Sequence, residues 1–385
     1  QIACHLANIG VEVLLLDILP RELTDEDQAK GWKETSKAWR NKIVQHHFEA
    51  AKKLKPAPLY HPGFADRIRI GNFEDDLPLV AEADWIIEAV IERRDIKLKV
   101  YESIEKHRKP GTLVSTNTSG IPINSLLEGR SEDFKRHFLG THFFNPPRYL
   151  KLLEIIPSKE TAPEVQEFFM EYGRKFLGKD TVACPDTPAF IANRIGVFSI
   201  MHLFHLVQEL GLTVEQVDKL TGPVIGRPKS ATFRTADVVG LDTLINVAQG
   251  LAGHLQGSEE AKVFALPPFL EHMQAQGWLG QKSGQGFYKK VKDSDGGSQI
   301  HALDLKTLAY RPSERVKFAS LEAAKPMEDL RERMRFLLSA KDEAGNFYRK
   351  STFALLHYAA GRIPESAEAC YKIDQALKAG FGWQL

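Results

Sequence analysis

The run Val11-Glu12-Val13-Leu14-Leu15-Leu16-Asp17 determines the fold class of the first part of this chain. It is short and almost continuously apolar, which is typical of a parallel strand buried on both faces of a sheet. Before it, residues 2–7 place apolar side chains at helical spacing, and Gly10 follows where a left-handed helix cap is expected. A helix that leads into a buried strand predicts an α/β fold.

Further apolar runs alternate with charged stretches along the next part of the chain. We predict strands at 67–70, 85–90, 112–115, 137–144 and 150–156, and helices at 21–55 and 95–106. This alternation predicts a Rossmann-like, doubly wound sheet. Because Gln1 already begins a helix, we expect the first strand of that sheet and its Gly-rich phosphate-binding turn to be missing from this chain. We therefore expect the chain as given to bind a dinucleotide weakly and to be poorly soluble.

Composition narrows the class of protein. The length of 385 residues corresponds to two or three domains of about 150 residues each. Apolar residues make up 43% and charged residues 26%, which indicates packed domains and excludes a disordered or coiled-coil protein. Lys plus Arg number 51 against 50 for Asp plus Glu, so no overall basic field predicts a nucleic-acid or anionic-membrane partner.

The cysteines and the apolar runs indicate where the protein is located and whether it binds a metal. The three cysteines lie far apart without a CxxC pair, so they predict neither a disulfide framework nor a metal site. No apolar run approaches the roughly 18 residues that a membrane span needs, and no signal peptide is visible. We expect a cytoplasmic protein with no metal site and no membrane span.

After the last predicted strand, the pattern becomes helical. Thr187 and Pro188 look like the cap and the first residue of a helix of about 23 residues, and Thr213 begins a capping box for the next helix. The DSDGGS stretch at 293–298 looks like a linker. We therefore expect a dinucleotide-binding domain at 1–183 that is truncated at its N-terminus, and two mainly helical domains at 184–292 and 299–385, the second of which is truncated.

The two helical domains share a weak echo. Asp218 precedes Gly226 by the same spacing by which Asp374 precedes Gly382, and each pair follows a long apolar helix. Either an internal duplication or chance explains a single match of this kind.

Glu154 lies in the run Leu152-Leu153-Glu154-Ile155-Ile156, where a carboxylate is costly unless it is paired or hydrogen-bonded. Its nearest plausible partner is His142, at the end of the preceding predicted strand, which is the sheet edge where α/β folds carry reactive groups. A carboxylate on one imidazole nitrogen stabilises the imidazolium and leaves the other nitrogen to act as a base. The alternative is a satisfied core histidine and a glutamate that faces the other side of its strand.

Other polar residues follow or interrupt predicted elements. Asp17 ends the strand at 11–17, where a dinucleotide fold binds the adenosine ribose and disfavours NADP, although a surface turn is the alternative. The stretch Ser115-Thr116-Asn117-Thr118-Ser119 suits hydrogen bonding to a substrate or cofactor, and a polar turn explains it equally well. Asn193 and Arg194 interrupt an apolar helix, so they should face a partner domain or a ligand. The pair His46-His47 is interpreted as solvated.

Several motifs together resemble one enzyme family, the L-3-hydroxyacyl-CoA dehydrogenases. They are Ser115-Thr116-Asn117-Thr118-Ser119, His142-Phe143-Phe144-Asn145-Pro146-Pro147 with Lys151-Leu152-Leu153-Glu154, Asp186-Thr187-Pro188-Ala189-Phe190-Ile191-Ala192-Asn193-Arg194 and Gly284-Gln285-Gly286-Phe287-Tyr288. The resemblance covers residues 1 to about 291, and the tail resembles the second C-terminal domain of the long, multidomain β-oxidation forms. It implies NAD-dependent oxidation of (S)-3-hydroxyacyl-CoA to 3-oxoacyl-CoA in fatty-acid β-oxidation.

The resemblance also implies roles for single residues. His142 matches the catalytic base, and Glu154 matches the acid that orients it. The implied substrate-binding residues are Ser119, Asn193 and Asn145, with Lys53 on the arm that faces CoA. The implied NAD-binding residues are Asp17, Glu92, Lys97, Asn117 and Lys282. The implied partners are an acyl-CoA thioester substrate and, outside this chain, a hydratase domain or a thiolase.

Two other functions remain open on the sequence alone. An NAD dehydrogenase of a hydroxy acid without CoA would turn over the free 3-hydroxy acid as well as its thioester. A scaffold relative that kept the fold and lost the chemistry is the second alternative. The joint presence of His142, Glu154, Ser119 and Asn193 argues against that second alternative.

Overall fold

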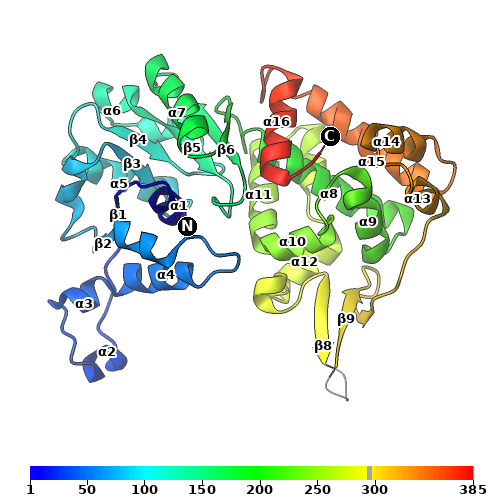
Figure 1. Cartoon of the computed structure of the whole chain (residues 1–385), viewed down its shortest axis with the longest axis horizontal. Coiled ribbons are helices and arrows are strands. Elements are labelled where there is room, and N and C mark those ends of the chain that lie inside the picture. The colour runs from blue at the N-terminus through cyan, green and yellow to red at the C-terminus, as the bar shows by residue number, and fades with distance from the viewer. Residues whose placement is uncertain (293–296, 385) are drawn as a thin grey trace. The chain divides into compact units, whose positions relative to one another are not determined.

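The computed structural model of the chain describes residues 1–292 and 297–384. The chain divides into two compact units, at 1–187 and 188–385. The first unit has the expected α/β architecture, and the second is mainly helical (Figure 1). The predicted subdivision of the helical part into 184–292 and 299–385 stays a prediction.

Helices and strands alternate through the first unit. Its elements are α1 (Ile2–Asn8), β1 (Val13–Asp17), α2 (Asp25–Ala29), α3 (Lys37–Arg40), α4 (Lys42–Lys52), η1 (Pro62–Arg67), β2 (Ile68–Asn72), η2 (Leu77–Glu82), β3 (Trp85–Glu88), α5 (Arg94–Glu105), β4 (Leu113–Thr116), η3 (Ile123–Leu127), α6 (Glu132–Arg136), β5 (Phe138–Phe143), β6 (Leu152–Pro157), α7 (Pro163–Lys175) and β7 (Asp180–Ala183). Every predicted strand is present, whereas α6, α7 and β7 were not predicted.

The strands of the first unit form two sheets. Within the described residues, β1 pairs only with β2, in parallel, and the second sheet has the order β3-β4-β5-β6-β7. Its strands are parallel except for β5 and β6, which are antiparallel. The doubly wound prediction is therefore confirmed in its mostly parallel order and corrected at β5–β6. The connection at 144–151 is too short for the crossover of a dozen or so residues that a parallel pair needs.

Two apolar clusters form the core of the first unit. One joins Leu6 of α1 to Leu139 of β5, Leu153 of β6 and Phe169 of α7. The other joins Cys4 and Ala7 of α1 to apolar side chains of α4 and β2. Burial of each large apolar side chain contributes about 1.5–3 kcal/mol. Because α1 contributes to both clusters, it packs against elements of both sheets.

The single helix predicted at 21–55 is wrong, because the segment forms α2, α3 and α4. Gly31 follows α2 with a φ of +73°, a conformation that residues with a side chain rarely adopt. Ser36 then accepts a hydrogen bond from the Lys33 N–H and donates one to the Lys33 carbonyl, which closes a turn before α3. Local turn chemistry therefore overrides helical propensity in this segment.

The second unit consists of helices and one small antiparallel sheet. Its elements are α8 (Ala192–Leu210), α9 (Val214–Thr221), η4 (Pro223–Ile225), α10 (Phe233–Val239), α11 (Leu241–His254), η5 (Glu259–Phe264), α12 (Pro268–Ala275), η6 (Gln281–Ser283), β8 (Tyr288–Lys292), β9 (Ser298–Leu303), β10 (Tyr310–Pro312), α13 (Ala319–Ala324), α14 (Leu330–Ser339), α15 (Glu343–Ala360) and α16 (Cys370–Phe381). The capping box predicted at Thr213 is confirmed.

Helix α8 begins later than predicted. Ala189 and Phe190 have φ angles of +60° and +55°, so the backbone is left-handed directly after Pro188 and helical only from Ala192. The helix spans 19 residues, ends at the left-handed Gly211 as predicted, and is buried along most of its length. No helix in the described ranges combines the length and the hydropathy needed to cross a lipid bilayer.

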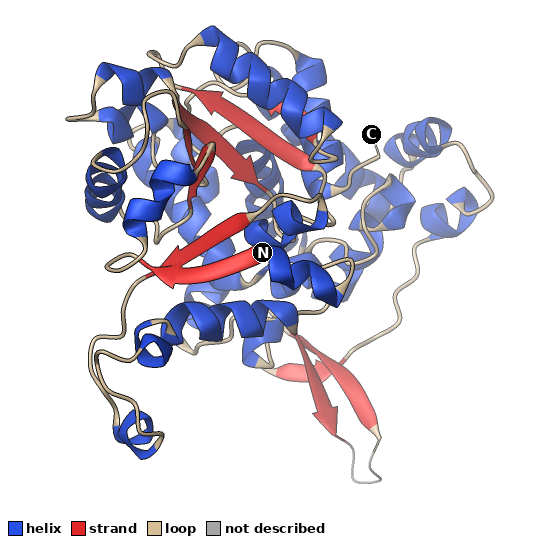
Figure 2. Ribbon diagram, turned by 60° about the vertical axis from the view of Figure 1, so that its left-hand side comes forward, coloured by secondary structure: helices blue, strands red, loops and turns tan. Residues whose placement is uncertain are grey.

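The linker predicted at 293–298 connects two paired strands. β8 and β9 are antiparallel, with Lys292 opposite Ser298, and Figure 2 draws them on either side of the grey segment. Residues 293–296 of that linker lie outside the described residues. Ser298 is the first residue of β9, so this end of the linker prediction is wrong. The short, lysine-rich β8 has no apolar alternation that would have indicated a strand.

The echo between the helical parts has a structural counterpart. Gly226 ends η4 and Gly382 ends α16, and both are left-handed, with φ angles of +70° and +67°. The Gln384 N–H donates to the Gly226 carbonyl at 2.9 Å. The Arg227 guanidinium lies 3.9 Å from the centroid of the Trp383 ring. The two echoing segments therefore contact each other at equivalent ends.

Candidate active site

His142 on β5 and Glu154 on β6 lie opposite each other in the antiparallel register. The Nδ1 atom of His142 lies 2.7 Å from Oε2 of Glu154. Both residues are buried, with 5% of His142 and 0% of Glu154 exposed. The expected contact is therefore present, and the alternative of a glutamate on the other face of its strand is wrong. Because Nδ1 faces a carboxylate, the hydrogen of that bond belongs on Nδ1.

The pair is shielded from solvent, and an aromatic ring packs against it. The Phe144 ring packs against the His142 ring with the centroids 4.9 Å apart. Leu153 and Ile155, the neighbours of Glu154 along β6, are fully buried on the opposite face of the sheet, so both faces are covered at this point. In surroundings of low dielectric, a carboxylate stabilises an imidazolium more strongly than it does in water. The pair is therefore suited to hold a proton that the imidazole takes from a bound molecule.

The polar stretch at 115–119 begins within β4, continues beyond its end and supports the strand that carries His142. The Ser115 hydroxyl is buried in the sheet and accepts a hydrogen bond from Thr141 at 2.8 Å. The Asn117 side-chain oxygen accepts from the Phe143 N–H at 2.9 Å, one residue after His142. Asn117 therefore fixes the end of β5 next to the imidazole.

Glu92 fixes the turn that presents Ser119. Its Oε1 accepts hydrogen bonds from the Thr118 hydroxyl at 2.5 Å, from the Ser119 N–H at 2.9 Å and from the Gly120 N–H at 3.0 Å. Burial alone would raise the pKa of Glu92, but these donors and the Lys97 charge outweigh burial and lower the pKa below its usual value. Glu92 is therefore an ionised acceptor for this turn.

Glu88 is the centre of a buried polar cluster that contacts Glu92 through Lys97. This cluster was not predicted from the sequence. The Lys97 ammonium lies 2.8 Å from Oε1 of Glu88, and the Tyr101 and Thr116 hydroxyls donate to Oε2 at 2.5 and 2.8 Å. Burial, followed by the charge of Glu88, raises the pKa of Tyr101. The signal for Glu88 was available, because it lies within an apolar run as Glu154 does.

Lys97 belongs to this buried cluster. It is 1% exposed, and its ammonium also lies 3.4 Å from Oε2 of Glu92. Lys97 therefore links the buried Glu88 to the carboxylate that supports the Ser119 turn. Its contact with NAD stays a prediction.

Asp17 ends β1, where the sequence placed it. Its Oδ2 lies 2.9 Å from Nδ1 of His47, and its Oδ1 accepts from the Ile18 N–H at 2.8 Å. His46 and His47 are exposed, as predicted for a solvated pair, but His47 has this partner. The Asp17 side chain keeps 32% of its surface exposed, so it can still reach a ligand.

Three further residues with predicted binding roles are exposed. Lys53 lies at the C-terminal end of α4, and Asn145 lies in the connection between β5 and β6. In the second unit, Lys282 of η6 pairs with Asp242 of α11. The roles of Lys53, Asn145 and Lys282 stay predictions.

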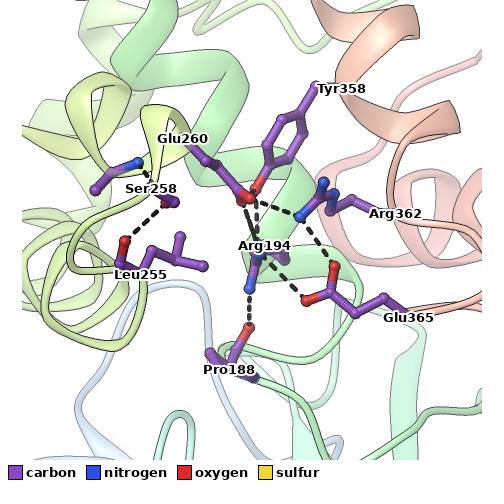
Figure 3. A network of polar contacts seen from close by, with 9 residues as sticks. Pro188, Arg194, Leu255, Ser258, Glu260, Tyr358, Arg362 and Glu365 are labelled. Carbon is purple, nitrogen blue, oxygen red and sulfur yellow. Dashed lines mark hydrogen bonds and ion pairs between the residues drawn. The ribbon is translucent and has the colours of Figure 1, made fainter.

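In the second unit, Asn193 lies in the first turn of α8, beside the fully buried Arg194. Figure 3 shows the polar network around Arg194. Its guanidinium donates to Oε1 of Glu260 and to the Tyr358 hydroxyl, both at 2.7 Å. Arg362 donates to the other oxygen of Glu260 at 2.6 Å. The polar partner predicted for Arg194 therefore lies within its own unit, on η5 and α15.

Two family profiles match most of the chain. One is described as "3-hydroxyacyl-CoA dehydrogenase, NAD binding domain" and matches residues 1–187. The other is described as "3-hydroxyacyl-CoA dehydrogenase, C-terminal domain" and matches residues 190–290. The first profile covers the unit that contains His142 and Glu154.

Curated relatives carry the same family name. A probable 3-hydroxyacyl-CoA dehydrogenase of Bacillus subtilis is 47% identical over 384 residues, which are 100% of this chain and 48% of that protein. The chain thus spans about half the length of this relative. A protein of the same name from Deinococcus radiodurans is 45% identical over 292 residues, which are 76% of this chain and 80% of that protein.

A solved structure has the same fold. The crystal structure of 3-hydroxybutyryl-CoA dehydrogenase from Escherichia coli K12 matches 99% of this chain and 86% of that chain, with a TM-score of 0.67 and 20% identity. This likeness concerns the fold, and the profiles and the relatives show the family. The chain belongs to the 3-hydroxyacyl-CoA dehydrogenase family, and residues 1–187 are its NAD-binding domain.

Proposed function

We propose that this protein oxidises (S)-3-hydroxyacyl-CoA to 3-oxoacyl-CoA, with NAD as the hydride acceptor, in fatty-acid β-oxidation. The observation that carries the proposal is the 2.7 Å contact between Nδ1 of His142 and Oε2 of Glu154. Oxidation of an alcohol by hydride transfer requires a base for the hydroxyl proton, and an imidazole paired with a carboxylate supplies one. Membership of the family supports the same reaction.

His142 is the general base in this proposal. Glu154 engages Nδ1, so Nε2 takes the proton from the C3 hydroxyl while the C3 hydride leaves, and it returns the proton in the reverse direction. Glu154 orients the ring and stabilises the imidazolium that forms. General-base assistance of this kind contributes roughly 10²- to 10⁴-fold to the rate.

The first unit offers groups that fit a dinucleotide. NAD, when bound, supplies the hydride acceptor. Asp17 ends a parallel strand with a partly exposed carboxylate, which suits hydrogen bonds to ribose hydroxyls and disfavours a 2′-phosphate. The proposed cofactor-binding residues of this unit are Asp17, Glu92, Lys97 and Asn117, and Lys282 is proposed from the second unit.

The substrate contacts follow the same proposal. Ser119 and Asn193 hydrogen-bond the reacting oxygen and polarise it as charge develops there. The turn supported by Glu92 gives Ser119 a fixed backbone for this task. Asn145 acts next to the His142–Glu154 pair, and Lys53 contacts the CoA part of the substrate.

The chain covers 48% of the length of its Bacillus subtilis relative. The substrate and the partner enzymes are therefore proposed for the whole protein. We propose an acyl-CoA thioester as the substrate. A hydratase domain would supply the 3-hydroxyacyl-CoA and a thiolase would consume the 3-oxoacyl-CoA, because these reactions precede and follow the oxidation chemically. A cytoplasmic location is part of the same proposal.

The test compares a thioester with its free acid. NADH consumption by the full-length protein is measured with acetoacetyl-CoA and with acetoacetate. We expect kcat/KM to be roughly 100-fold higher for the thioester, because binding of the CoA part is used to orient the reacting end. Equal values would favour a dehydrogenase of free hydroxy acids, and no turnover of either compound would favour a scaffold without chemistry.

A further inference from the structure

Lys179 is a buried lysine that the proposed mechanism does not use. It lies between α7 and β7 and is 3% exposed. Its ammonium donates to the carbonyls of Pro147 and Leu150, the latter at 2.9 Å. Both carbonyls belong to the connection between β5 and β6. Lys179 therefore binds two carbonyls of the segment that joins the strand of His142 to the strand of Glu154.

The partners of this ammonium are unusual for a buried charge. In the part of the chain that the structure describes, Lys179 forms no ion pair with a carboxylate. Burial lowers its pKa to about 8, so the charged form is only moderately favoured near neutral pH. Burying a cation against carbonyls alone is costly, and an apolar side chain of similar volume would avoid that cost. Stability is therefore a weak reason for a lysine at this position.

Further contacts fix the position of the Lys179 ammonium and of its backbone. The ammonium lies 5.6 Å from the centroid of the Phe143 ring, the residue after His142. The backbone N–H of Lys179 donates to the Gly173 carbonyl at 2.9 Å, which fixes the base of the side chain on the end of α7. The backbone of the neighbouring residue is also anchored, because the Asp180 N–H donates to the Lys151 carbonyl at 2.8 Å. Lys179 thus reaches from a fixed backbone to the connection that it bridges.

We propose that Lys179 is a positioning residue for the reaction, which fixes the β5–β6 connection and thereby keeps His142 and Glu154 aligned across the two strands. The inference rests on the proposed function. Small displacements of a base from its productive geometry are costly, and a shift of 1 Å can reduce a rate roughly 100-fold. Burial of the lysine then lowers the free energy of unfolding, while its contacts increase the rate of the reaction.

The experiment compares Lys179→Met with the wild-type protein and with Lys175→Met, a lysine at the exposed end of α7. Turnover of acetoacetyl-CoA and NADH gives kcat and both KM values, and thermal unfolding reports the fold. We expect Lys179→Met to fold with an unchanged or higher Tm and to lose roughly 10- to 100-fold in kcat, with the KM for NADH within about twofold. Lys175→Met should match the wild type.

A pH profile separates positioning from a purely structural role. In the oxidation direction, kcat/KM should fall at acid pH as the base becomes protonated. Misalignment with Glu154 removes support for the imidazolium, so this acid limb should move to lower pH in Lys179→Met. If that variant does not fold, Lys179→Gln serves instead, because its amide reaches one carbonyl and not both. Lys179→Gln should show a smaller loss of kcat and a smaller shift of the acid limb than Lys179→Met.

The outcomes are distinct. A folded Lys179→Met, or a folded Lys179→Gln, with wild-type kcat and an unmoved acid limb would overturn the inference while leaving the proposed function intact. A wild-type protein without turnover would overturn the proposed function and the inference with it. A lowered kcat, an unchanged KM for NADH and a moved acid limb together support the positioning role.

Discussion

The Nε atom of Arg194 lies 2.7 Å from the Tyr358 hydroxyl oxygen, so the first turn of α8 is bonded to a helix near the end of the chain. Glu260 completes the arrangement, because it accepts from both side chains. Arg194 is fully buried and Glu260 is largely buried. The neighbouring Asn193 therefore lies on a helix end whose position depends on this network.

Arg194→Met should destabilise the protein by about 2 kcal/mol, because Oε1 of Glu260 loses its charged donor while Arg362 still pairs with Oε2. Tyr358→Phe removes one hydroxyl and should cost about 1 kcal/mol. Urea unfolding measures both values. Arg331→Met, at an exposed position of α14, is the control and should change the free energy of unfolding little. Equal stability of Arg194→Met and the control would show that the network contributes nothing.

Glu92→Gln should weaken the turn that presents Ser119. The amide keeps the shape but removes the charge on the oxygen that accepts from Thr118, Ser119 and Gly120. We expect kcat/KM for acetoacetyl-CoA to fall roughly tenfold, since charge-assisted hydrogen bonds are about twice as strong as neutral ones. Steady-state kinetics check this, with the exposed Glu102→Gln as the matched control. Unchanged kinetics would mean that the turn keeps its geometry without the charge.

Asp17→Asn should reduce the preference for NADH over NADPH. The aspartate would place a negative charge against the 2′-phosphate of NADP, and asparagine removes that repulsion. We expect the ratio of the kcat/KM values for the two cofactors to fall by roughly tenfold or more. Asp25→Asn, on the exposed surface of α2, should leave the ratio unchanged. A wild-type protein that uses both cofactors equally well would contradict the placement of Asp17.

His5 should make the protein sensitive to acid. Burial, followed by the charge of Lys179, lowers the pKa of His5 from 6.5 to about 4. The folded state therefore favours the neutral ring, and the unfolded state binds the proton first as the pH falls. Stability from this residue is complete above pH 6.5 and is lost as the pH falls to about 4, by about 3 kcal/mol in total.

The check on His5 is the pH dependence of urea unfolding. His5→Gln can still donate to the Leu177 carbonyl that His5 contacts, but it does not titrate. Its stability should decline less than that of the wild type between pH 6.5 and 4. The exposed His46→Gln serves as the control and should keep the wild-type slope. Parallel curves for the wild type and His5→Gln would contradict the assignment.

The sequence predicted the elements whose physical signals are local. The buried run that ends at Asp17 forms a parallel strand. A partner for Glu154 could be predicted because an isolated carboxylate in an apolar run is costly, and His142 is that partner. The capping box at Thr213 and the left-handed end at Gly211 are equally local signals. These features depend on a few neighbouring residues, so they can be read from the chain.

The missed features depend on contacts that are distant in the sequence. The partners of Arg194 lie on η5 and α15, and nothing near Arg194 in the sequence indicates them. The ammonium of Lys97 is buried against Glu88, a contact that was not predicted from the sequence. The antiparallel pairing of β5 with β6 was also missed, because strand direction follows from the length of the connection rather than from the composition of the strands.

The central claim is that His142 is the base and that Glu154 supports it, and the kcat of His142→Gln tests it most directly. The full-length variant is assayed with acetoacetyl-CoA and NADH, beside Glu154→Gln and the exposed control His46→Gln. We predict that kcat falls roughly 10²- to 10⁴-fold in His142→Gln and by a smaller factor in Glu154→Gln, while His46→Gln stays at the wild-type value. A folded His142→Gln variant with the kcat of the wild type would contradict the account.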